Sequence, residues 1–159
     1  MDNSSLLCCP RCHGALRAGT CTQCQTRYEE TLGILDLRWP RPKPMSQTEK
    51  TLLFKLIDNY HKVGFSELVA MRFQNSQLPA DIRQEYEEYA QNPILRSQKM
   101  LDMFRERFME RFSLPESGVA LDIGCGVGAS SFLLASQFDQ VVGIDVDLIS
   151  LILARKFLE

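Results

Sequence analysis

The sequence lacks long apolar runs and shows no marked excess of either charge. No segment reaches the run of about 18 apolar residues that a membrane-spanning helix requires. The N-terminal residues MDNSSLLCC do not form a secretory signal, because they contain no basic stretch followed by an apolar segment. The formal net charge of -2 lacks the basic excess typical of nucleic-acid-binding proteins. These absences predict a globular protein that is located in the cytoplasm and does not enter a membrane.

The cysteines are crowded near the N-terminus, where five of the six lie between Cys8 and Cys24. In a reducing cytoplasm this crowding favours metal binding over disulfides. Two Cys-x-x-Cys pairs, Cys9 with Cys12 and Cys21 with Cys24, supply the four thiolates of a closed tetrahedral zinc site. Because the protein fills all four positions, the zinc ion is expected to be structural. Cys8 is the alternative to Cys9, but Cys9 has the usual two-residue spacing. A redox dithiol would not need two pairs.

Composition divides the chain into three segments, and together they predict an α/β protein. Residues 1–40 are rich in cysteine, glycine and threonine and are expected to form a small zinc-binding domain that ends at the prolines of RWPRPKPM. Residues 41–117 form a linker and a helical segment, in which TEKTLLFKLIDNY places its apolar residues on one helix face. Proline-containing breaks at SQLPAD and QNP predict three or four separate helices.

Residues 118–159 alternate between strand and helix patterns. VALDI predicts a strand, GASSFLLASQF a helix, VVGID a second strand and DLISLILARKFLE a second helix. Alternation of this kind is typical of a parallel sheet with helical crossovers. The third segment is therefore expected to be the start, βαβα, of a Rossmann-like sheet.

A glycine-rich loop follows the first of these strands and indicates a nucleotide-derived cofactor. Gly124, Gly126 and Gly128 also fit the dinucleotide fingerprint, with Asp145 about 20 residues further along. Asp122 separates the two possibilities, because a carboxylate near the end of a buried strand would repel a pyrophosphate. The same charge would attract the cationic methionine end of S-adenosylmethionine. The loop therefore favours S-adenosylmethionine, and a nicotinamide dinucleotide remains the alternative.

The residues VALDIGCGVGASSFLLA and VVGIDVDLISLILAR resemble those of the class I S-adenosylmethionine-dependent methyltransferases. The resemblance implies that Gly124, Gly126 and Gly128 pass close under the cofactor. It also implies that Asp122 contacts the methionine end, and that Asp145 accepts hydrogen bonds from the ribose hydroxyls. The N-terminal pieces CPRCHGAL, CTQC and RYEETLGILDL resemble the small zinc-ribbon domains of methyltransferases and of their activator subunits.

The resemblance implies a methyltransferase in which a substrate nucleophile takes the sulfonium methyl group by in-line displacement. Complete sheets of that family contain more strands than this sequence supplies. We therefore expect an N-terminal portion that lacks the acceptor site and is inactive alone. The catalytic base is unassigned, and RNA, protein and small molecules remain candidate acceptors. Two alternatives are a non-catalytic zinc-ribbon module that binds RNA or protein, and an NAD(P)-dependent oxidoreductase.

Overall fold

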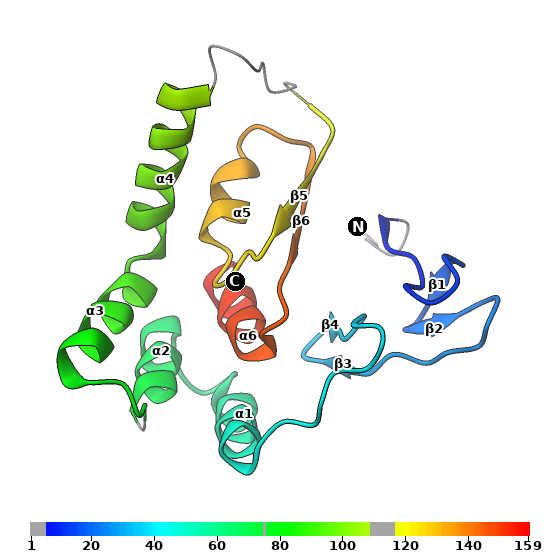
Figure 1. Cartoon of the computed structure of the whole chain (residues 1–159), viewed down its shortest axis with the longest axis horizontal. Helices are drawn as coiled ribbons and strands as arrows, with labels where there is room; N and C mark the ends of the chain where they lie inside the picture. Colours follow the sequence, from blue (N-terminus) through cyan, green and yellow to red (C-terminus); the bar gives the residue numbers. More distant parts are fainter. Residues whose placement is uncertain (1–5, 75, 109–116) are drawn as a thin grey trace. The chain divides into compact units, whose positions relative to one another are not determined.

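The computed structural model describes residues 6–74, 76–108 and 117–159 and is mixed α/β (Figure 1). The chain forms two compact units, Met1–Gln47 and Thr48–Glu159. The boundaries expected after residues 40 and 117 stay predictions. Among the described residues, no helix combines the length and the apolar character needed to cross a membrane.

The first unit is built on two small antiparallel hairpins, as expected for a domain with little apolar surface to bury. The paired strands are β1 (Leu16–Arg17) with β2 (Thr20–Cys21), and β3 (Glu30–Thr31) with β4 (Ile34–Leu35). Its core consists of four buried side chains, those of Cys9, Leu16, Cys21 and Tyr28. Two of these four are predicted metal ligands, so much of the core of this unit is the cysteine cluster itself.

Four helices follow and confirm the predicted helical segment. They are α1 (Gln47–Asn59), α2 (Phe65–Phe73), α3 (Ala80–Gln91) and α4 (Pro93–Phe108). Pro79 stands at the N-terminal boundary of α3 and Pro93 begins α4, positions where a missing backbone N–H costs nothing. The apolar face predicted for the first helix is present, since Leu56 is fully buried and Tyr60, just beyond the helix, is almost so.

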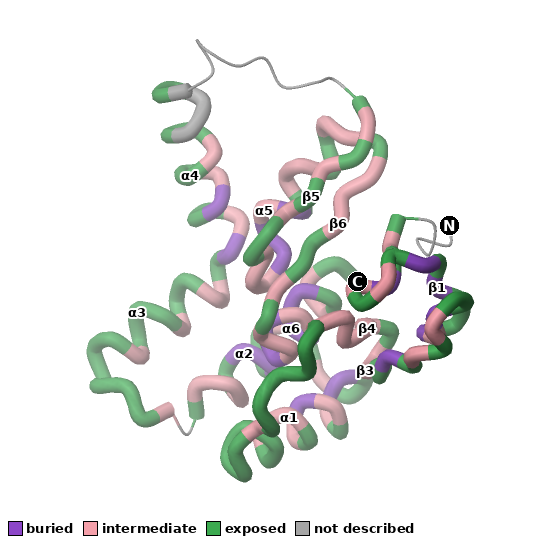
Figure 2. The backbone as a smooth tube through the Cα atoms, turned by 45° about the vertical axis from the view of Figure 1, so that its right-hand side comes forward, coloured by how far each residue is buried: buried purple, intermediate pink, exposed green. Residues whose placement is uncertain are grey.

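The end of the chain confirms the predicted strand-helix-strand-helix order. β5 (Val119–Ile123), α5 (Ala129–Leu134), β6 (Gln140–Ile144) and α6 (Leu148–Phe157) follow one another, and β5 pairs with β6 in parallel. α4 runs beside α5, while α2 packs against α6 (Figure 1). Leu68 and Val69 of α2 and Ile152 and Leu153 of α6 are fully buried, which shows where the core of this unit lies (Figure 2).

One face of the two-stranded sheet is bare. Val119, Leu121 and Ile123 alternate along β5 and are 54%, 57% and 76% exposed. The intervening Asp122 hydrogen-bonds to Ser131 of α5, so this helix covers the other face. Parallel sheets are normally covered by helices on both faces. Among the described residues, this sheet is therefore covered by a helix on one face and lacks a helix against the exposed side of β5.

Candidate functional site

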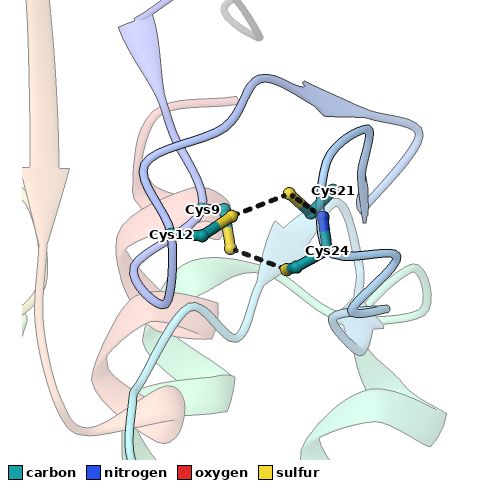
Figure 3. Close-up of side chains that lie close together, drawn as sticks. All are labelled: Cys9, Cys12, Cys21 and Cys24. Carbon is teal, nitrogen blue, oxygen red and sulfur yellow. Dashed lines mark hydrogen bonds between the residues drawn. The ribbon is translucent and has the colours of Figure 1, made fainter.

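The structure brings the four predicted metal ligands together. Cys9 and Cys12 come from one loop and Cys21 and Cys24 from another, and the sulfur atoms all lie within 4.8 Å of one another (Figure 3). The Sγ atoms of Cys9 and Cys24 are 3.6 Å apart, and those of Cys12 and Cys21 are 3.4 Å apart. A tetrahedral zinc ion with Zn–S bonds of about 2.3 Å separates its sulfurs by about 3.8 Å. The donor set therefore fits zinc.

Hydrogen bonds reach the sulfurs of Cys21 and Cys24. The backbone N–H groups of Gln23 and Cys24 both donate to Sγ of Cys21 over 3.4 Å. The Thr26 hydroxyl lies 3.1 Å from Sγ of Cys24 and, with the Thr26 backbone N–H, lowers the pKa of that thiol to about 6. These contacts supply the supporting shell that orients ligands in stable metal sites.

Tyr28 is a supporting residue that the sequence did not reveal. Its buried hydroxyl lies 3.1 Å from Sγ of Cys9. The hydrogen bond to Cys9 and burial raise the pKa of Tyr28 to about 12, so the hydroxyl keeps its proton and acts as a donor toward a thiolate. Only the position of Tyr28, a few residues after the second cysteine pair, could have suggested this role. Cys8 is exposed and lies outside the cluster, whereas Cys9 is one of its four members.

The glycine loop between β5 and α5 leaves open space above two of its glycines. Gly124, Gly126 and Gly128 have φ angles of +76°, +54° and +80°, which side chains rarely tolerate. A Cβ atom at Gly124 or Gly126 would meet no atom within 4 Å, whereas at Gly128 it would lie 3.1 Å from Cβ of Ala154. The first two glycines therefore offer a bare backbone surface to a ligand, and the third allows the loop to pack against α6.

Most backbone N–H groups of the loop are already used inside the protein. The N–H groups of Gly124 and Cys125 donate to the carbonyl of Ile144 over 2.8 and 3.0 Å. The N–H of Gly126 donates to Oδ2 of Asp145, and that of Gly128 donates to the carbonyl of Cys125, each over 2.9 Å. A pyrophosphate at a glycine-rich loop is normally bound by such N–H groups. The N–H groups of these four residues are therefore not available to a phosphate.

Two predicted carboxylates flank the loop. Asp122, near the end of β5, accepts a hydrogen bond from the Ser131 hydroxyl over 2.7 Å. Asp145 directly follows β6, and its Oδ1 accepts from the backbone N–H of Asp147 over 2.8 Å. A carboxylate oxygen can accept more than one hydrogen bond, so both groups keep capacity for a ligand. The structure thus places the two acids beside the loop, each oriented by its own partners.

Gly143 and Cys125 complete the surroundings of Asp122. Gly143 pairs with Asp122 across the two strands, and a Cβ atom there would lie 2.9 Å from Oγ of Ser131 and 3.0 Å from Sγ of Cys125. Burial, followed by the charges of Asp122 and Asp145, raises the pKa of the Cys125 thiol to about 11. A protonated, half-buried thiol of this kind is a poor nucleophile. Sequence reasoning did not identify Ser131 or Gly143, because nothing in their spacing singles them out.

A pocket of about 270 Å³ lies next to the loop within the second unit. Its lining includes Gly124, Cys125, Gly126 and Val127 from the loop, with the remainder contributed mainly by α2, α3, α4 and α5. The glycine loop therefore forms part of the wall of this pocket.

Comparison with known proteins gives one partial similarity. The chain is 43% identical over 53 residues to phosphoethanolamine N-methyltransferase 1 of Arabidopsis thaliana. The matched part is 31% of this chain and 11% of that protein, so the chain spans only a small fraction of the length of its curated relative. No known family profile matches the chain. No solved structure matches it either.

Proposed function

We propose that this chain carries the cofactor-binding part of an S-adenosylmethionine-dependent methyltransferase, joined to a unit that holds a structural zinc ion. The observation that carries the proposal is the glycine loop itself. Its N–H groups are largely bonded within the protein, and a carboxylate stands on either side of it. A surface of this kind suits a cationic ligand without phosphate, which describes S-adenosylmethionine.

The residues have separate roles in this proposal. Gly124 and Gly126 let the cofactor approach the backbone closely, because no atom occupies the space a side chain would take. Asp145 accepts hydrogen bonds from the ribose hydroxyls through lone pairs that its backbone partners leave unused. Asp122 faces the positively charged methionine end, with its carboxylate held by Ser131.

When bound, the cofactor supplies a methyl group on a sulfonium centre. The protein's contribution is to hold donor and acceptor in line and to keep water out, and alignment alone accounts for a large part of the rate in such reactions. The cysteine cluster takes no part in this chemistry. Its four thiolates fill a tetrahedral ion completely and leave no position for water or substrate. The zinc ion would instead stabilise a unit with a very small apolar core.

The partial similarity to phosphoethanolamine N-methyltransferase 1 supports the same class of reaction. A nicotinamide dinucleotide is less well suited, because its pyrophosphate would meet the Asp122 carboxylate and a loop in which the N–H groups of Gly124, Cys125 and Gly126 are bonded internally. Methyl transfer therefore stands as the proposed activity, and oxidoreductase chemistry is the alternative that the same experiment tests.

Calorimetric titration with S-adenosylhomocysteine and, separately, with NAD⁺ tests the proposal. We expect S-adenosylhomocysteine to bind and NAD⁺ not to bind. Gly126→Val should abolish the binding, because its side chain would occupy the open space above the loop. Gly118→Ala is a suitable control, since Gly118 also has a positive φ and open space but lies before β5, away from the loop. Tighter binding of NAD⁺, or no binding of either ligand, would contradict the proposal.

A further inference from the structure

The pocket beside the glycine loop has a distinct electrostatic character. Two arginines, Arg72 of α2 and Arg96 of α4, line it, and no aspartate or glutamate is among its lining residues. Helix α4 runs alongside α5, so the cationic wall and the glycine loop lie on the same side of the second unit (Figure 1). The charged side chains that line the pocket are positive, whereas those that flank the glycine loop are negative.

The two arginines differ in how their charges are used. The guanidinium of Arg72 donates to Oδ2 of Asp147 over 2.9 Å and to Oγ of Ser150 over 2.8 Å, so its charge is balanced. Arg96 is exposed and lies over the ring of Tyr89, 5.4 Å from its centroid. Within the described part of the chain, Arg96 forms no ion pair. Its five N–H donors are therefore the part of the lining best able to bind an anion.

Aromatic and hydroxyl groups complete the pocket. Tyr86 and Tyr89 of α3 line the pocket and are 53% and 46% exposed. Glu85, which lies outside the lining, raises the pKa of the Tyr89 hydroxyl. Ser97 of α4 and Ser130 of α5 bring their hydroxyls to 3.3 Å from each other. Such a wall offers flat apolar surface beside a cation and hydroxyl groups, and its size suits a small molecule rather than a polymer.

We infer that this pocket binds the methyl acceptor, contrary to the expectation from the sequence that this portion lacks the acceptor site, and that the acceptor is a small molecule that carries a carboxylate or phosphate group next to a ring. Arg96 binds the anionic group, and Tyr86 and Tyr89 contact the ring. The inference rests on the proposed function, because the pocket shares Gly124, Gly126 and the intervening loop with the proposed cofactor surface. The carboxylate of the cofactor is the other anion that could reach Arg96, and the experiment below separates the two.

Three probes test the chemistry of the pocket: phenyl phosphate, phenol and inorganic phosphate, titrated into the zinc-loaded chain and followed by ligand-observed NMR. We expect phenyl phosphate to bind about tenfold or more tightly than either phenol or inorganic phosphate, because only it engages both Arg96 and the tyrosine rings. Arg96→Gln should remove this preference and Arg96→Lys should retain part of it. Lys99→Gln is the matched control, since Lys99 is exposed on the same helix but does not line the pocket.

Equal binding of the three probes, no binding of phenyl phosphate, or equal losses in Arg96→Gln and Lys99→Gln would overturn the inference. Repeating the titration with saturating S-adenosylhomocysteine identifies the source of the anion. We expect both ligands to bind together, whereas competition would assign Arg96 to the cofactor's carboxylate and overturn the acceptor site. If S-adenosylhomocysteine does not bind in its own titration, the proposed function is contradicted. The comparison of the three probes tests the preference of the pocket for an anion independently of that result.

Discussion

The Ser131 hydroxyl donates a hydrogen bond of 2.7 Å to Oδ2 of Asp122, and so joins helix α5 to the end of strand β5. The absence of a side chain at Gly143 on the neighbouring strand makes room for this contact. The bond orients the carboxylate and leaves its charge intact. The Ser131 hydroxyl thus helps to orient the Asp122 carboxylate beside the loop.

Changes at this pair should weaken cofactor binding to different extents. Asp122→Asn removes the charge and should weaken S-adenosylhomocysteine binding by about tenfold or more, corresponding to about 1.4 kcal/mol. Ser131→Ala keeps the charge but loses the orienting bond, and should weaken binding by a smaller factor. Calorimetry measures both changes, and a thermal melt of each variant checks its folding. Wild-type affinity in Asp122→Asn would rule out the role assigned to this carboxylate.

Two glycines of the loop should respond differently to alanine. Gly126→Ala adds a side chain in open space and should lower stability by about 1 kcal/mol, the cost of the positive φ alone. Gly128→Ala bears the same conformational cost and also places its Cβ 3.1 Å from that of Ala154, so its loss of stability should be larger. Chemical denaturation measures the two free energies of unfolding. Cofactor binding should fall further in Gly126→Ala, and the reverse order in stability would contradict the packing role of Gly128.

Zinc should bind in a ratio of one ion per chain and stabilise residues 1–47. Removal of the ion with a chelator should unfold this unit, because two of its four core side chains are predicted ligands. Elemental analysis and the NMR spectrum of the unit report the two effects. Cys21→Ser should abolish zinc binding, and Cys8→Ser, which alters an exposed cysteine outside the cluster, should leave it unchanged. Retention of zinc by Cys21→Ser would show that the cluster is not the site.

Cys125 should react slowly with iodoacetamide at neutral pH. Its pKa is raised to about 11 by burial and by the charges of Asp122 and Asp145, and only the thiolate form reacts. The rate should therefore rise about tenfold per pH unit below that value. Asp122→Asn removes one of the charges and should speed the reaction at a given pH. Mass spectrometry of the zinc-loaded protein follows the modified peptide, with exposed Cys8 as the internal reference. A pH-independent rate would contradict this assignment.

Asp147 should contribute more to stability than an ordinary surface acid. Its carboxylate caps α6 by accepting from the backbone N–H of Ile149, and it also accepts hydrogen bonds from Arg72 and Ser150. Asp147→Ala should cost about 1–2 kcal/mol, because it removes the cap and leaves Arg72 without its ion-pair partner. Arg72→Ala keeps the cap and should cost less. Thermal unfolding of the single and double variants gives the coupling, and purely additive effects would contradict a direct link between α2 and α6.

The sequence alone predicted the features that depend on local pattern. The spacing of two cysteine pairs predicted the four cysteines that the structure brings together, and a strand pattern before and after the glycine loop predicted the parallel β-α-β unit. The cap of the last helix by Asp147 is of the same local kind, because capping depends on residues within one turn. These features follow from residues that are close together in the chain, so their spacing carries the information.

The tertiary structure decided which distant side chains meet. Arg72 contacts Asp147, Ser97 contacts Ser130, and Tyr28 contacts Cys9, and no periodicity or motif connects the members of these pairs. It also showed that the loop N–H groups are bonded internally and that a pocket with two arginines adjoins them. The reason is physical: backbone conformation follows local sequence, whereas a charge, a hydroxyl or an open space acquires its role only from the groups that packing brings beside it.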